Sequence, residues 1–138
     1  MTRSEIKLIY RITSEDDDLF ALVEKLKTQP NKIWRMGDLI DKRALARYKK
    51  NGISFCSNEK HSQKFDAQVE SLVRILAPIK DTLEKLSRTC YSELSCVVHI
   101  YGDDRPAIHF NKETLLFFAN LNADIDIDLY SFSSTIAS

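Results

Sequence analysis

Three carboxylates near the C-terminal end are the residues of this sequence that are best placed to do chemistry. Asp124, Asp126 and Asp128 alternate with apolar residues, so a β-strand would place them on one face about 6.6 Å apart, twice the rise per residue. Such a row could hold a hard metal ion or present an acidic ladder to a basic partner. Because a straight strand makes its side chains diverge, we expect no metal site here.

The apolar residues between these carboxylates predict how the strand is oriented. Ile125, Ile127 and Leu129 occupy the opposite face of the same strand. Alternation of this kind is typical of a strand with one face on the core and one in solvent. We therefore expect the isoleucines and the leucine to point inward and the carboxylates to form a solvated face.

A second acidic group and a basic loop lie elsewhere in the chain. Asp16, Asp17 and Asp18 precede an apolar helical pattern, where acidic residues favour the positive end of a helix dipole. Residues 32–50 contain seven Lys or Arg against two Asp, a local balance of 7 − 2 = +5. The remainder of the chain compensates, because the whole sequence has twenty basic and twenty acidic residues. We expect a solvated loop between the strands predicted at 32–38 and 53–56, and nucleic acid is not the expected partner.

The single tryptophan lies at the start of this basic loop. Trp34, Arg35 and Asp38 lie close together in the sequence, around a turn expected at Gly37. An aromatic wall with a few polar groups is typical of a ligand pocket, whereas a large ring can equally anchor the core. The three residues are the candidate ligand site if the protein binds a small molecule.

Signatures of catalysis are missing from the sequence. It has no glycine-rich phosphate loop, GxSxG, HExxH or CxxC, and its three cysteines suit free buried thiols. His99 and His109 could face each other across a hairpin, but a lone strand histidine is usually a packing residue. We predict a protein that is not an enzyme, with no catalytic residues, no metal and no cofactor; an enzyme of unrecognised type using these histidines is the weakest alternative.

Length and composition predict one domain. A chain of 138 residues with 43% hydrophobic residues can bury one sizeable core, so we expect a single domain over 1–138 whose tail frays from about 133 to 138. The N-terminus lacks the apolar region of a signal peptide, and no run could cross a bilayer. We therefore expect a cytoplasmic protein without a membrane partner.

Hydrophobic periodicity predicts the element order βαββαββαβ. This order, with several short links between strands, favours an α+β fold with a mixed, mainly antiparallel sheet and helices packed on it. Pro78 predicts a break in the longest helix. The expected strands are 6–12, 32–38, 53–56, 94–101, 107–110 and 125–130, and the expected helices are 14–28, 62–88 and 111–122.

Two segments carry a resemblance to a known family. They are the stretch Pro30-Asn31-Lys32-Ile33-Trp34-Arg35-Met36-Gly37-Asp38 and the ending Asp124-Ile125-Asp126-Ile127-Asp128-Leu129-Tyr130, with the long helix between them. The sequence resembles bacterial domain-of-unknown-function family 4279 over roughly residues 5–131. The resemblance implies a small bacterial cytosolic α+β protein and transfers no catalytic residue onto this chain.

The leading functional hypothesis is a protein that binds another protein. A compact domain with separate acidic and basic surfaces favours fast and specific protein association. An immunity protein that neutralises a toxin would work this way, with Asp16–Asp18 and the carboxylates of residues 124–128 against a basic toxin surface. A small-ligand sensor or accessory domain is the alternative. The sequence leaves the partner and the oligomeric state open.

Overall fold

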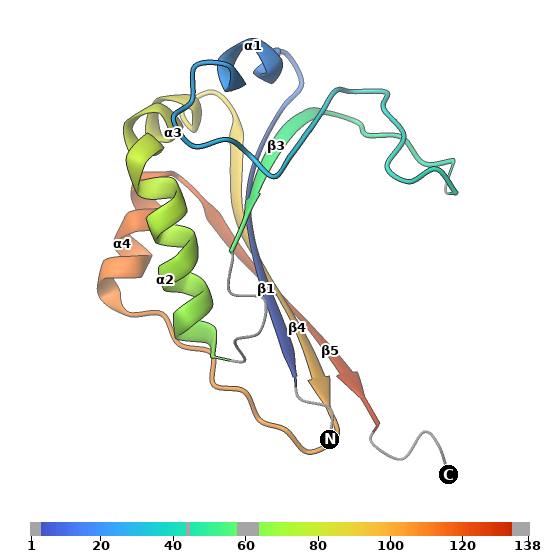
Figure 1. Ribbon diagram of the computed structural model, residues 1–138, viewed down its shortest axis with the longest axis vertical. Helices are drawn as coiled ribbons and strands as arrows, with labels where there is room; N and C mark the ends of the chain where they lie inside the picture. The colour runs from blue at the N-terminus through green and yellow to red at the C-terminus, as the bar shows by residue number, and fades with distance from the viewer. Residues whose placement is uncertain (1–3, 44, 58–63, 134–138) are drawn as a thin grey trace.

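The computed structural model describes residues 4–43, 45–57 and 64–133 and shows one sheet with helices on one side (Figure 1). The predicted frayed tail therefore lies largely outside the described residues. The strands are β1 (Glu5–Ser14), β2 (Lys32–Trp34), β3 (Asn51–Cys56), β4 (Tyr91–Tyr101) and β5 (Asp124–Phe132). The helices are α1 (Leu19–Val23), α2 (Phe65–Leu76), the 3-10 turn η1 (Ala77–Ile79), α3 (Lys80–Leu86) and α4 (Lys112–Asn120).

The sheet order is β2-β3-β1-β4-β5. The β2–β3, β3–β1 and β1–β4 pairs are antiparallel, and β5 joins β4 in parallel after the crossover through α4. The expected mixed, mainly antiparallel α+β sheet is confirmed. It places β2 at one edge and β5 at the other.

The core lies between the sheet and the helices. β1 buries every second side chain, and its residues Leu8, Tyr10 and Ile12 are completely buried, as the two-residue period predicts. Helix α2 covers β1 with its apolar face, and α4 reaches the same core through Phe118, whose ring lies 6.2 Å from that of Tyr10. No helix among the described residues is long and apolar enough to cross a membrane.

The long middle helix breaks where the sequence indicates. Pro78 lies in η1, between α2 and α3, because proline cannot donate the hydrogen bond that would continue α2. Helix α4 begins at its predicted cap, since Asn111 Oδ1 accepts a hydrogen bond of 2.8 Å from the Thr114 backbone N–H.

The first helix is much shorter than predicted. The expectation of a helix over 14–28 is wrong, because α1 begins after Asp18, whose side chain accepts a hydrogen bond from the Phe20 N–H. Ser14 instead ends β1 and accepts hydrogen bonds from the backbone of the acidic turn. The Gln29 side chain donates to the Val23 carbonyl at 2.9 Å and so satisfies the end of the helix.

The predicted strand at 107–110 is also wrong. Residues 105–111 form no strand because both sides of β4 are already occupied, by β1 and by β5. Pro106 removes a backbone donor at the start of this segment. Ile108 and Phe110 pack against the core instead, and the Phe110 ring meets Phe65 of α2 edge-on at 5.0 Å.

Candidate protein-binding surface

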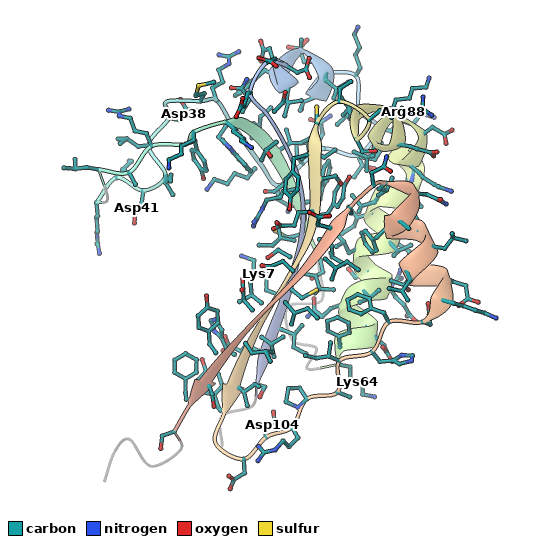
Figure 2. The ribbon with its side chains drawn as sticks, turned by 180° about the vertical axis from the view of Figure 1, so that it is seen from behind. Lys7, Asp38, Asp41, Lys64, Arg88 and Asp104 are labelled. Atoms are coloured by element: carbon teal, nitrogen blue, oxygen red, sulfur yellow. The ribbon has the colours of Figure 1, made fainter. Side chains whose placement is uncertain are left out.

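The helices leave one face of the sheet uncovered. In Figure 2, which shows the molecule from behind, Lys7 of β1 points away from the helices into the open side. The same face carries the residues of β5 that pair in register with the outward positions of β4, because residues paired across parallel strands point the same way. The predicted acidic row lies on this face: Asp124 is in register with Glu93, Asp126 with Ser95 and Asp128 with Val97.

The carboxylates of β5 reach solvent. Asp124 and Asp126 are exposed and Asp128 is half-buried. Asp124 belongs to a network, since Tyr91 Oη lies 3.1 Å from Asp124 Oδ2 and 2.9 Å from Glu93 Oε2, and Glu93 pairs with Arg11 at 3.2 Å. Removal of solvent around the hydroxyl and hydrogen bonding to two carboxylates raise the pKa of Tyr91 above its ordinary value. Tyr91 therefore stays a neutral donor.

The apolar residues of β5 face the helix side of the sheet, as expected, but they are not buried there. Ile125, Ile127 and Leu129 are 38%, 42% and 58% exposed, respectively. They lie in register with Leu94, Cys96 and Val98, which are completely buried, so they point to the helix side of the sheet. In Figure 1, helices α2 and α4 lie to one side of the sheet, and the lower end of β5 continues beyond them. β5 therefore exposes side chains on both of its faces.

The edge of β5 completes this surface. Within the part of the chain that the structure describes, β5 has a strand neighbour on the β4 side alone. Its outer main-chain groups are those of an edge strand, which can pair with a strand from another molecule. Carboxylates on an edge are also a common protection against indiscriminate pairing. The outer edge of β5 thus has main-chain groups that can pair with another strand, and carboxylates that would select the partner by its charge.

The other predicted carboxylates have structural partners. Asp17 Oδ2 lies 3.4 Å from Cys90 Sγ and 3.2 Å from Ser14 Oγ, and Asp18 caps α1 while its other oxygen lies 3.7 Å from Arg35. Asp16 contributes its backbone N–H to the same turn. Because Cys90 contacts Asp17 and the next residue contacts Asp124, the two acidic groups lie at the same end of the sheet.

Two of the three cysteine thiols are buried. Burial, and secondarily the charge of Asp126, raises the pKa of the Cys96 thiol to about 12, and burial raises that of Cys90. Both are free cysteines that remain protonated at neutral pH. Cys56 is also free and is half-buried. All three thiols are free, as expected, and the expected burial holds for Cys90 and Cys96 but not for Cys56.

Trp34, Arg35 and Asp38 build the base of a hairpin rather than the wall of a cleft. The Trp34 ring is 7% exposed and stacks on Tyr48 at 4.8 Å. Arg35 lies over the Phe20 ring at 4.0 Å, and Asp38 Oδ2 accepts a hydrogen bond of 2.8 Å from the Arg35 N–H. Each side chain of the alternative ligand site is thus occupied by a local contact.

Residues 35–43 and 45–50 form an arm whose projection from the sheet the sequence did not predict. The segment is solvent-exposed, as the expected loop should be, and it folds back on itself as an irregular hairpin, with an isolated bridge between Leu39 and Arg47 and a hydrogen bond from Arg47 Nη1 to the Gly37 carbonyl at 2.7 Å. Figure 1 shows the arm projecting from the sheet on the side away from α2 and α4. Four of its apolar side chains are exposed: Met36 at 51%, Leu39 at 43%, Ile40 at 46% and Leu45 at 93%. The signal in the sequence was the placement of these apolar residues among the cations.

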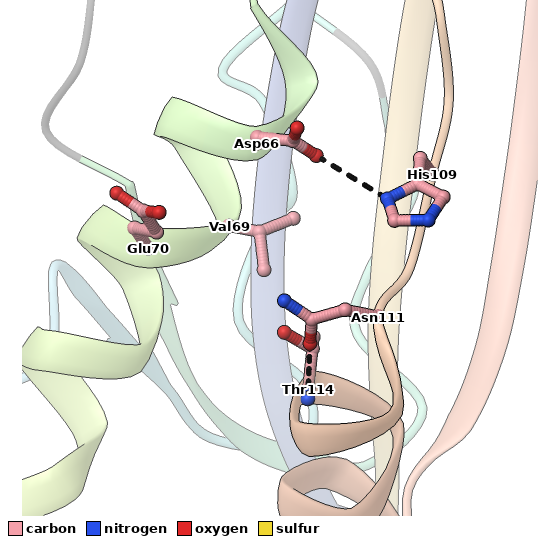
Figure 3. A pocket seen from close by; sticks show the side chains of 6 residues that line it. All are labelled: Asp66, Val69, Glu70, His109, Asn111 and Thr114. Atoms are coloured by element: carbon pink, nitrogen blue, oxygen red, sulfur yellow. Dashed lines mark hydrogen bonds and ion pairs between the residues drawn. The ribbon is translucent and has the colours of Figure 1, made fainter.

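His99 and His109 lie in different places, so they do not form the cross-strand pair that the sequence suggested. His99 of β4 lies on the open face, with its ring 5.4 Å from Tyr130 and 5.6 Å from Phe132. His109 lies at a small cleft of about 110 Å³, where its Nδ1 is 3.9 Å from Asp66 Oδ1 (Figure 3). Asp66, Val69, Glu70, His109, Asn111 and Thr114 line this cleft.

Comparison with known families gives a match over nearly the whole chain. The family model described as "Domain of unknown function (DUF4279)" matches residues 4–132. The chain belongs to the DUF4279 family. The match runs from just before β1 to the end of β5, so the whole sheet, the arm and the cleft are parts of the family domain. No curated protein and no solved structure matches this chain.

Proposed function

We propose that this DUF4279 domain binds another protein and that the outer edge of β5 is its recognition surface. The observation that carries the proposal is the exposure of both faces of an edge strand. Asp124 and Asp126 are exposed on one face, and Ile125, Ile127 and Leu129 are 38–58% exposed on the other. An edge strand that only needed protection from aggregation would not expose a row of aliphatic side chains.

Strand addition is the binding mode that uses all of these features. A partner segment in extended conformation would hydrogen-bond to the outer edge of β5 and place alternate side chains on its two faces. Cations opposite the aspartates and aliphatic side chains opposite the isoleucines would match this pattern. Cross-strand pairs of this kind contribute about 0.2–1 kcal/mol each, so three charge pairs contribute about 0.6–3 kcal/mol.

The partner class that fits is a protein with a basic surface. We infer that the domain acts in the manner of a cytoplasmic immunity protein and neutralises a toxin domain whose basic cleft meets the carboxylates. Charge complementarity of this kind raises association rates and selects the partner. Asp16–Asp18 lie at the same end of the sheet as Asp124 but are held in a turn and a helix cap, so they extend the negative field rather than form the contact.

The binding mode can be tested with a peptide of alternating Lys and Val, nine residues long to match β5. We expect the peptide to bind the wild-type domain and to bind the triple variant D124N/D126N/D128N about 10-fold more weakly, because three charge pairs are lost. The control variant D41N/D81N/D103N removes three exposed carboxylates elsewhere and should bind as the wild type does. Equal affinities of all three proteins would overturn the proposal.

The immunity class needs a separate measurement. Tagged wild type and tagged D124N/D126N/D128N are each used in an affinity pull-down at moderate salt. Proteins that only the wild type retains are then tested for toxicity with and without co-expression of the domain. Protection by the wild type and loss of protection in the triple variant would support the class. A retained partner without toxic activity would leave protein binding in place and remove the immunity role.

A further inference from the structure

The arm and the edge of β5 have complementary chemistry. The 32–50 segment has a balance of +5, and four aliphatic or thioether side chains of its arm are 43–93% exposed. β5 has three aspartates and three aliphatic side chains that are 38–58% exposed. Each surface lacks the charge that the other supplies, and the whole chain has no net charge.

One molecule does not bring these two surfaces together. The arm connects β2 to β3 at one edge of the sheet, and β3, β1 and β4 separate β2 from β5. Four strand spacings of about 4.8 Å make this separation roughly 19 Å. Figure 1 shows the arm and the far end of β5 pointing in different directions. A contact between them therefore needs two molecules.

We propose that the arm of one copy docks on the outer edge of β5 in a second copy. The occupant is the segment with exposed Leu45 at 93%, flanked by the exposed cations Lys42, Arg43, Lys49 and Lys50. The proposal rests on β5 as the recognition surface, and it adds that a second copy competes for this surface with any other basic protein. Reciprocal docking closes a symmetric dimer, whereas one-way docking builds chains of molecules.

Nucleic acid fits the arm less well than a protein surface does. The Trp34 ring is 7% exposed and stacked on Tyr48, and Lys32 Nζ lies 5.9 Å and 5.3 Å from the two ring centroids. These aromatic faces are therefore occupied, although base stacking would require them free. The exposed aliphatic side chains of the arm also match the aliphatic row of β5 rather than phosphates.

Charge exchange between two variants tests the proposal. The first, K42E/R43E, reverses two exposed cations of the arm for which the structure shows no side-chain partner among the described residues. The second, D126K/D128K, reverses two carboxylates of β5 and leaves the Asp124 network intact. In each variant alone, the reversed side chains have the same sign of charge as the surface on which they would dock. In an equimolar mixture, each reversed surface meets an opposite charge on the other variant.

The measurement is sedimentation velocity over a concentration series at low and at high salt. We expect the wild type to self-associate at low salt, each variant alone to lose association at least 10-fold, and the mixture to recover it. The control K25E/K27E reverses two exposed cations beside α1 and should associate as the wild type does. The variant L45S removes the most exposed apolar side chain of the arm and should weaken association without changing charge.

Two outcomes overturn the proposal. A wild type that stays monomeric at every concentration and salt excludes it, and so does a mixture that associates no better than its components. Binding of the monomeric wild type to anionic lipid vesicles, lost in K42E/R43E, would assign the arm to a membrane instead. The Lys-Val peptide separates the two proposals: if K42E/R43E binds it as the wild type does, β5 remains a recognition surface even without self-association.

Discussion

The two edge strands of the sheet, β2 and β5, differ in what lies on their outer sides. At the β2 edge the chain continues into an arm, and Trp34 and Tyr48 cover the strand ends with stacked rings. At the other edge, β5 is the outermost strand, with aspartates on one face and partly exposed aliphatic residues on the other. The difference shows that β2 is held by its own hairpin, whereas β5 is held by β4 on one side and has its other side open to solvent.

Substitution of two leucines on the same face of the sheet should give the largest difference in the free energy of unfolding. Leu94 of β4 is completely buried, and Leu129 of β5 is 58% exposed. We expect L94A to lower the free energy of unfolding by about 2–5 kcal/mol, because it leaves a cavity in the core, and L129A to lower it by less than about 1 kcal/mol. Urea titration followed by circular dichroism measures both. Equal losses would show that the aliphatic row of β5 belongs to the core.

The base of the arm depends on one glycine. A Cβ at Gly52 would lie 2.1 Å from Trp34 Cζ2 and 2.3 Å from Cε2, so the stacked ring would have to move. We expect G52A to lower the free energy of unfolding by about 2–3 kcal/mol through overpacking and to change the fluorescence of the single tryptophan. In the W34A background, G52A should lower the free energy of unfolding much less than it does in the wild type, because the ring that the new Cβ would contact is absent. Additive losses would mean that the two residues do not interact.

Alkaline pH should reveal the buried phenol of Tyr10. Burial raises the pKa of Tyr10 from 10.0 to about 12, so the native state holds its proton more tightly than the unfolded state does. The resulting stabilisation is complete below pH 10 and is lost as the pH rises toward 12, a change on the order of 2 kcal/mol.

Two phenylalanine variants isolate this effect. Y10F removes the titrating phenol and should make the fall in the free energy of unfolding above pH 10 shallower. Y130F, which changes a half-exposed side chain of β5, should keep the steeper fall. Urea titrations at several pH values measure these slopes, and parallel slopes for Y10F and the wild type would contradict the assignment.

The smallest expected change in stability distinguishes Asp18, which has a structural role, from Asp126, which is proposed to bind a partner. Asp18 caps α1 and pairs with Arg35, so D18A should cost about 1 kcal/mol of stability. Asp126 is exposed on the edge strand, and D126A should change stability by less than about 0.5 kcal/mol. Thermal unfolding of both variants checks this order, and a larger loss for D126A would assign the β5 row to folding rather than to binding.

Local patterns predicted the elements whose signals lie within a few residues. The alternation in β1, the Asn111 cap and the proline break between α2 and α3 all follow from contacts between near neighbours in the sequence. The strand expected at 107–110 failed because its pairing depended on β4, whose two sides were taken by distant segments. The helix expected over 14–28 is shorter because Asp18 caps it just before Leu19 and the Gln29 side chain donates to the Val23 and Leu26 carbonyls at its other end.

The candidate surface divides in the same way. The sequence by itself determined that Asp124, Asp126 and Asp128 share one face of a strand and that residues 32–50 concentrate positive charge, since both depend on order and spacing alone. Only the tertiary structure decided that this strand is an edge, that its aliphatic row is partly exposed and that the basic segment is a projecting arm. These properties depend on which strands pair and how far the helices extend over the sheet, and both are set by contacts between residues far apart in the chain.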